Sequence, residues 1–172
     1  MGSAELAGET IEQLAVNLMN EHSSSILRLC FLYLQDHHLA EDAMQETFLK
    51  ACRSWNQFKG ESSTGTWLSK IAVNVCRDYS RRNWFKLLRL SQSLDDVPEP
   101  IMPVQEFDDT LILSVMRLPR KLKEPILLYF YRGLSVQEIA QILSASVPTV
   151  YRWIKQAQNL LKVELEGWFY NE

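Results

Sequence analysis

Residues 133–161 read GLSVQEIAQILSASVPTVYRWIKQAQNLL, a pattern typical of two short helices joined by a tight turn. Ser135 lies three residues before Glu138, which is the spacing of a capping box, so a helix is expected to begin there. The Ser-Ala-Ser of residues 144–146 interrupts the helical pattern. Its last serine and Pro148 suit the start of a second helix, because first-turn N–H groups have no partner within the helix. The stretch therefore predicts a helix-turn-helix.

The second helix of such a motif lies in the major groove of DNA, where polar side chains meet base edges and phosphates. One side of the expected helix is apolar, and the other carries five residues suited to these contacts: Thr149, Tyr151, Arg152, Lys155 and Gln156. A plain helical hairpin in an all-helical core has the same cap and the same apolar stripe. This stretch alone leaves both interpretations open.

Charge is distributed unevenly along the 172 residues, whose formal net charge is −3. Residues 77–89 hold five basic residues and one acidic residue, and residues 117–162 hold eight basic and two acidic ones. Between them, residues 91–109 contain six carboxylates, three prolines and no Lys or Arg. Such a segment tends to stay extended and suits a linker. We therefore expect an all-α protein with two small helical domains, residues 1–90 and 110–172, that touch DNA at two places.

The composition argues against several other classes of protein. No apolar run is long enough to span a membrane and the first residues lack a secretory signal, so a cytoplasmic protein without membrane insertion is expected. Cys30, Cys52 and Cys76 lie far apart within apolar helical patterns and are expected to be reduced core thiols. His37 and His38 are expected in a short polar connection without a metal. A glycine-rich phosphate loop is also absent, so no ATP site is expected.

The first half of the chain contains two amphipathic patterns. Residues 11–34 are expected to form a helix with a break near residues 22–24. Residues 39–58 have a clearer helical pattern, with a core side that includes Met44, Phe48, Ala51 and Trp55. The other side carries acidic residues in its first turns, an order that complements the helix dipole. The same side offers a docking patch for a partner helix, formed by Asp42, Gln45, Glu46 and Leu49.

A loop at residues 56–66 precedes the next helix, which is expected to follow a cap at Thr66. One side of this helix is apolar, and the opposite side carries Lys70, Asn74, Arg77 and Arg81. Such a row suits a phosphate backbone, although an ordinary solvated face has the same composition. Trp55, Phe58 and Trp67 lie beside the loop and offer aromatic surfaces for unstacked bases.

The second half is expected to begin a helix at Thr110, to break it at Pro119, and to continue with a helix that leads to Gly133. The core side of that helix is expected to contain Ile126, Leu127, Phe130 and Tyr131. The closing aromatic residues 168–170 fit either an exposed tail or a clasp onto this half.

Three of these segments, taken in order, resemble the extracytoplasmic-function (ECF) group of bacterial RNA polymerase sigma factors, the two-domain sigmas. They are AEDAMQETFLKA at 40–51, TWLSKIAVNVCRDYSRR at 66–82, and LPRKLKEPILLYFYRGLSVQEIAQIL at 118–143, followed by PTVYRWIKQAQNLL. They are similar to the family's polymerase-docking segment, its minus-ten reader and its minus-thirty-five domain. The resemblance covers most of the chain.

The resemblance implies a role for each candidate surface. The docking patch of Asp42, Gln45, Glu46 and Leu49 would face the clamp helices of the largest subunit of core RNA polymerase. The loop at 56–65 would receive a flipped base, and the minus-ten element would be contacted by Phe58, Trp67, Lys70, Asn74, Arg77 and Arg81. The minus-thirty-five element would be contacted by Thr149, Tyr151, Arg152, Lys155 and Gln156. The implied partners are core polymerase, promoter DNA and an anti-sigma factor. The resemblance also implies a protein that is not an enzyme and needs no cofactor.

The recognition helix departs from the family pattern. Trp153, Gln156 and Gln158 stand where the family usually has basic residues, and Ser144 replaces the common glycine of the turn. Fewer phosphate contacts are therefore expected from this helix. Two alternatives stay open at this stage: a stand-alone helix-turn-helix regulator, and a sigma-like decoy that binds polymerase or an anti-sigma without initiating transcription.

Overall fold

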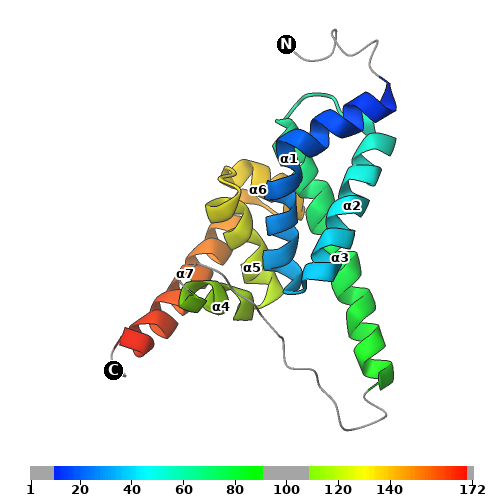
Figure 1. The fold of residues 1–172 in the computed structure, drawn as a ribbon. Coiled ribbons are helices and arrows are strands. Elements are labelled where there is room, and N and C mark those ends of the chain that lie inside the picture. The colour runs from blue at the N-terminus through cyan, green and yellow to red at the C-terminus, as the bar shows by residue number, and fades with distance from the viewer. Residues whose placement is uncertain (1–9, 91–108, 170–172) are drawn as a thin grey trace. The chain divides into compact units, whose positions relative to one another are not determined.

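The computed structural model describes residues 10–90 and 109–169, and every regular element in these ranges is helical. The chain divides into two compact units, residues 1–96 and 97–172. Figure 1 follows the chain through both. The fold class predicted from the sequence is thereby confirmed as all-α. Most of the expected linker, and Tyr170 of the aromatic end, lie outside the described residues.

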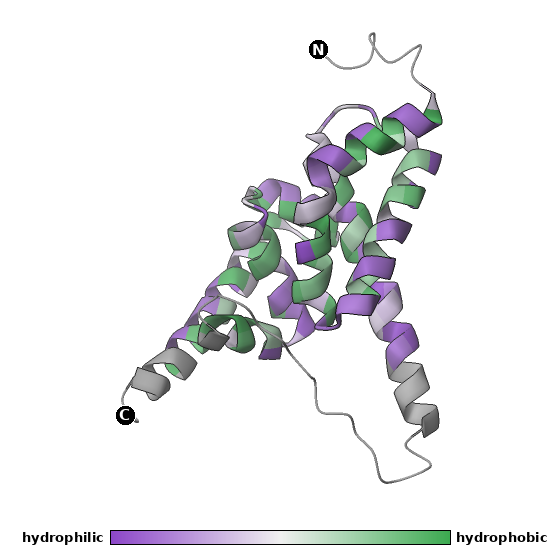
Figure 2. Ribbon diagram, viewed as in Figure 1, coloured by the Kyte–Doolittle hydropathy of each residue, from purple (hydrophilic) through white to green (hydrophobic). Residues whose placement is uncertain are grey.

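The first unit is built from three long helices: α1 (Ile11–Leu34), α2 (His37–Arg53) and α3 (Thr64–Leu90). Each of the three contacts the other two. Their shared core is made of apolar side chains with almost no exposed surface, including Ile26, Leu29, Cys30, Ala43, Phe48, Leu68, Val73 and Val75. Figure 2 shows polar and apolar residues side by side along each helix, as expected where one face is buried and the other is solvated.

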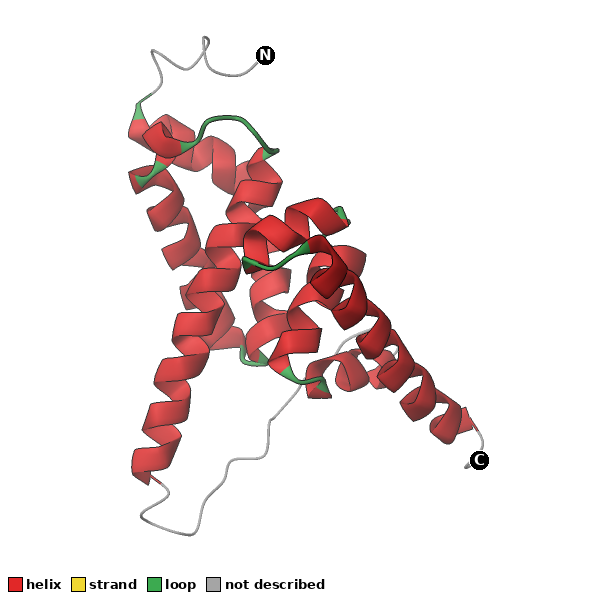
Figure 3. Ribbon diagram, turned by 180° about the vertical axis from the view of Figure 1, so that it is seen from behind, coloured by secondary structure: helices red, strands yellow, loops and turns green. Residues whose placement is uncertain are grey.

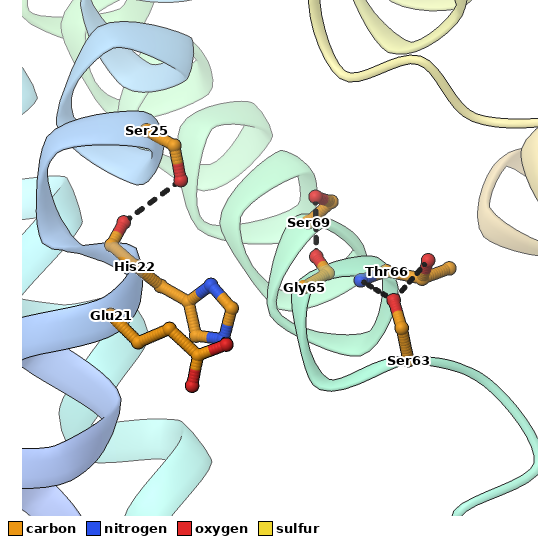
Figure 4. Close-up of polar contacts among 7 residues, drawn as sticks. All are labelled: Glu21, His22, Ser25, Ser63, Gly65, Thr66 and Ser69. Carbon is orange, nitrogen blue, oxygen red and sulfur yellow. Dashed lines mark hydrogen bonds and ion pairs between the residues drawn. The ribbon is translucent and has the colours of Figure 1, made fainter.

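The predicted break near residues 22–24 is wrong, since α1 is continuous. The Ser25 hydroxyl donates a hydrogen bond to the His22 carbonyl at 3.0 Å (Figure 4), which satisfies a polar side chain inside a helix. The start of α2 was also misplaced. Asp36 caps the helix by accepting from Leu39 N at 2.8 Å, so both histidines belong to its first turn. His37 stacks on Phe31 with ring centroids 4.4 Å apart.

The connection between α2 and α3 is partly ordered by local hydrogen bonds. After α2 ends at Arg53, a short 3₁₀ turn, η1 (Trp55–Gln57), holds Trp55 outside the helix that the sequence predicted through residue 58. The cap of α3 is Ser63 and not Thr66: Ser63 Oγ accepts from Thr66 N at 3.1 Å, and Thr66 is buried in the first turn (Figure 4). A capping side chain accepts from a backbone N–H two or three residues further along the chain, and Ser63 has this spacing to Thr66 N.

The second unit consists of α4 (Asp109–Arg117), α5 (Arg120–Ile126), the π-helical turn η2 (Leu127–Tyr131), α6 (Val136–Leu143) and α7 (Val147–Phe169). Helix α7 contacts α4, α5 and α6, and short loops join the helices (Figure 3). The core includes Leu122, Ile126, Leu128, Ile139, Val150 and Ala157.

The prediction that Phe130 belongs to this core is wrong. Its side chain is 58% exposed, and Leu128, which was not predicted, is fully buried. The cause is η2: a π-helical turn has a longer repeat than an α-helix, so residues after Leu127 no longer follow the 3.6-residue pattern. Ile126 and Leu127 are buried as expected.

Candidate functional site

The helix-turn-helix predicted from residues 133–161 is present in the second unit. Ser135 N donates to Glu138 Oε2 at 2.9 Å and Glu138 N donates to Ser135 Oγ at 3.3 Å, which completes the capping box. Ser144 ends α6 in the left-handed conformation, with φ of 52°, so serine here occupies a backbone conformation that favours glycine. The turn therefore keeps its geometry despite the departure from the family pattern.

Helix α7 presents four of its five candidate DNA-binding residues to solvent: Tyr151, Arg152, Lys155 and Gln156. Val150, Ile154 and Ala157 are buried and fix the orientation of this face. Thr149 differs from the other candidates because it is half-buried. Its N–H donates to Ser146 Oγ at 3.3 Å and the two hydroxyls lie 2.8 Å apart, so Thr149 takes part in capping α7.

The candidate minus-ten residues of α3 lie on one side of the helix but differ in exposure. Lys70, Asn74 and Arg81 are exposed, whereas Arg77 is half-buried and engaged in a contact of its own. Arg81 also forms an ion pair with Asp78 at 2.8 Å. The row therefore exists as predicted, with part of its charge balanced inside the protein.

Three aromatic residues meet at the start of α3 and form what we call the aromatic cluster: Trp55, Phe58 and Trp67. The ring centroids are 5.2 Å apart for Trp55 and Phe58, 5.0 Å for Phe58 and Trp67, and 5.7 Å for Trp55 and Trp67. All three side chains are half-buried, so part of each stays accessible. Rings that support each other in this way give a firm surface on which a base can stack.

The docking patch on α2 contains both free and paired groups. Asp42 and Gln45 are exposed, and Leu49 is 57% exposed although it is a large apolar side chain. Glu46 is half-buried and its Oε1 lies 3.0 Å from Lys50 Nζ. The sequence pattern predicted neither this ion pair nor the wider network to which it belongs.

The network around Glu46 joins α2 to α3. Lys50 Nζ also lies 4.0 Å from Asp78 Oδ2, and the Tyr79 hydroxyl interacts with Glu46. The hydrogen bond from Lys50 is the main cause that lowers the pKa of Glu46, with a smaller contribution from Tyr79. Burial, followed by the hydrogen bond to Glu46, raises the pKa of Tyr79. Glu46 is therefore an ionised carboxylate with partners inside its own chain.

A second contact that sequence reasoning missed joins α5 to α7. The Lys121 ammonium lies 5.4 Å from the centroid of the Trp153 ring. Lys121 is exposed and Trp153 is half-buried. No periodicity links the two residues, because the packing of the two helices brings them together.

Groups suited to a metal or to a membrane span are not found among the described residues. Within residues 10–90 and 109–169, His, Cys, Asp and Glu do not form a cluster of three able to hold a metal ion. No helix in the same ranges is long and apolar enough to cross a membrane. None of the three cysteines forms a disulfide with another described residue; Cys30 and Cys76 are buried as expected, whereas Cys52 is half-buried. Burial raises the pKa of Cys52.

Two helical units, one with a helix-turn-helix and one with a basic helix beside an aromatic cluster, define a DNA-binding protein with two contact regions. Family models agree with this division: Sigma-70 region 2 matches residues 18–86 and Sigma-70 region 4 matches residues 109–159. The ECF RNA polymerase sigma-E factor of Haemophilus influenzae is 31% identical over 163 residues, which cover 87% of this chain and 86% of that protein. The chain belongs to the ECF sigma factors of bacterial RNA polymerase.

A second relative agrees with this assignment, and two solved structures share the fold. The ECF sigma factor SigW of Bacillus subtilis is 28% identical, with 87% of each chain covered. The sigma factor RpoE of Bartonella quintana, solved with the anti-sigma factor NepR, has the same fold, with a TM-score of 0.74, 19% identity, and coverage of 90% of this chain and 98% of that one. CnrH, solved in complex with the cytosolic domain of CnrY, also has the same fold, with a TM-score of 0.67 and 21% identity. The match covers 94% of this chain and 92% of that one.

The protein is thus a promoter-recognising sigma factor, a class of non-enzymatic regulator that binds core RNA polymerase and promoter DNA. Matches to both sigma regions along most of the chain favour this function over the stand-alone helix-turn-helix regulator.

Proposed function

We propose that the first unit docks on core polymerase through α2 and opens the minus-ten element through α3. The docking patch of Asp42, Gln45, Glu46 and Leu49 faces the clamp helices of the largest subunit. The exposed Leu49 is the observation that best supports this part, because an isolated large apolar side chain next to polar groups such as Gln45 and Glu46 suits the centre of a protein interface. The neighbouring carboxylates then supply the polar surroundings.

Strand opening is assigned to the aromatic cluster and the polar side of α3. A base flipped from the duplex loses its stacking, at a cost of a few kcal/mol. The cluster returns part of this free energy by stacking, while Lys70 and Asn74 contact the flipped base and its neighbours. Arg77 and Arg81 hold the phosphates. The meeting of Phe58 and Trp67 at 5.0 Å, directly beside the first turns of α3, is the single observation that carries this proposal.

The second unit anchors the protein upstream. Tyr151, Arg152, Lys155 and Gln156 read the minus-thirty-five element, with Arg152 suited to guanine and Gln156 to adenine. Thr149 contributes mainly by holding the start of α7. We propose domain limits of 1–90 and 110–172, with residues 91–109 as the linker.

The remaining features of the proposal concern partners and location. The protein needs no cofactor, catalyses no reaction and works in the cytoplasm. Two proteins of the same fold support an anti-sigma partner. RpoE was solved with the anti-sigma factor NepR, and CnrH was solved with the cytosolic domain of CnrY.

Run-off transcription with core polymerase over a random promoter library tests the whole proposal. We expect transcripts whose templates share two sequence elements, one recognised by each unit. Stable binding to polymerase without transcription from any template would instead support the sigma-like decoy, which the sparse basic residues of α7 would also fit.

A further inference from the structure

The contact between Lys121 and Trp153 places a cation from α5 beside the recognition helix. Trp153 lies four residues after Thr149 and three before Gln156, so on the helix surface it borders the face proposed to read DNA. The Lys121 ammonium, 5.4 Å from the Trp153 ring, therefore lies at the edge of that face. It comes from a helix in which the sequence predicted no individual DNA-contacting residue.

The contact leaves the ammonium able to bind an anion. A cation over an aromatic ring interacts with the electrons of the ring and does not use its N–H donors on an acceptor atom. Lys121 is exposed, and no ion pair between described residues involves it. Its neighbour Arg120 differs, because its Nε lies 3.7 Å from the carboxylate of Glu124.

The position of the charge determines what it can meet on DNA. A recognition helix in the major groove has a phosphate backbone on each side, so a cation at the flank of the helix meets phosphate and not a base edge. Trp153 itself carries no charge. The structure puts a positive charge near this position from a different helix.

We propose that Lys121 is a phosphate-binding residue of the minus-thirty-five module, held in place by the Trp153 ring. The proposal rests on the function proposed for α7. Lys121 adds affinity for any duplex and no preference for sequence, because phosphates carry no sequence information. It adds to the positive charge that Arg152, Lys155 and Lys162 give α7.

The test measures how salt affects binding of the full chain to a fluorescein-labelled duplex of random sequence, by anisotropy at low salt. Each lost phosphate contact makes the slope of log K against log[salt] shallower by about 0.9. We expect this change for Lys121→Gln and none for Lys121→Arg. Adding Trp153→Arg to Lys121→Gln should restore the original slope, since the charge then returns on α7. Circular dichroism melting of each variant checks that it is folded.

The results separate this proposal from the function on which it rests. A lower melting temperature for Lys121→Gln with an unchanged slope would make Lys121 a structural clasp only and overturn the inference. The double variant Arg152→Gln, Lys155→Gln tests α7 itself, and it should lose the upstream sequence preference that the promoter library reveals for the parent protein. If that variant keeps this preference, the proposed role of α7 fails, whatever Lys121 does.

Discussion

Replacement of one buried isoleucine in each unit tests whether the two units fold as separate bodies. Ile26 in α1 and Ile139 in α6 both have 0% exposed surface, while Ile11 is 71% exposed and serves as a matched control. Ile→Ala removes three carbon groups, worth about 2.4 kcal/mol at about 0.8 kcal/mol each, and the cavity left behind adds to this within an observed range of about 2–5 kcal/mol. A unit this small unfolds with an m value of about 1 kcal/mol/M in urea, so its midpoint should fall by about 3 M.

Urea denaturation is monitored by hydrogen exchange and mass spectrometry, which report the protection of the peptides of each helix separately. Ile139→Ala should remove protection from peptides of α6 and α7 and leave α1 to α3 unchanged, and Ile26→Ala should do the reverse. Ile11→Ala should stay within about 0.5 kcal/mol of the parent protein. Equal loss of protection in both units after either core substitution would refute the reasoning, because it would mean that the chain unfolds as one cooperative body.

Four further outcomes follow from the candidate surfaces. Leu49→Glu should weaken binding to core polymerase about tenfold or more, because it places a charge at the centre of the docking patch. Val16→Glu, a control at a comparably exposed position on α1, should leave this binding unchanged. Equal effects of the two substitutions in a pull-down would argue against the patch. Arg152→Ala should cost about 1–3 kcal/mol at one base pair of the upstream element in a promoter library, and a uniform loss over all sequences would reduce its role to phosphate contact. Asn74→Ala should impair transcription from linear duplex more than from a pre-melted template; equal loss would count against strand opening. Because the pKa of Glu46 is lowered in the folded protein, its stabilising effect is present above the ordinary value of 4.5 and is lost as the pH falls through the folded-state value. Urea titrations at decreasing pH should therefore show a smaller loss of stability for Glu46→Gln than for the parent, and identical acid profiles would contradict this.

Local signals gave reliable predictions in the helix-turn-helix. The capping box of Ser135 and Glu138 spans one helical turn, and its hydrogen bonds form as the spacing predicted. The buried stripe of Val150, Ile154 and Ala157 was equally predictable, since all three residues follow the helical repeat. The positions of the candidate side chains on α2, α3 and α7 follow from the same regularity.

Features that depend on packing between helices were missed, and so was one change in helical repeat. The π-helical turn η2 changes the repeat within one helix, so Phe130 is exposed where the α-helical pattern put it in the core. The pairing of Glu46 with Tyr79 and the contact of Lys121 with Trp153 each join two helices far apart in sequence. Nothing in the spacing of either pair indicates that they meet. The starts of α2 and α3, observed at His37 and Thr64, were predicted at the wrong residues for a different reason. The prediction overlooked Asp36 and Ser63 as caps.

The acidic side of α2 contains two kinds of carboxylate, and this difference has a kinetic consequence. Glu41 and Asp42 are exposed, whereas Glu46 already interacts with Lys50 and Tyr79. Exposed charges attract a basic partner from a distance of about 8 Å at physiological salt and so influence the association rate. Glu46 must release Lys50 and Tyr79 before its carboxylate can bind a group of another protein, so it acts only after the two proteins are in contact. We therefore expect salt and the exposed pair to control how fast polymerase captures the protein, and Glu46 to control how long the complex lasts.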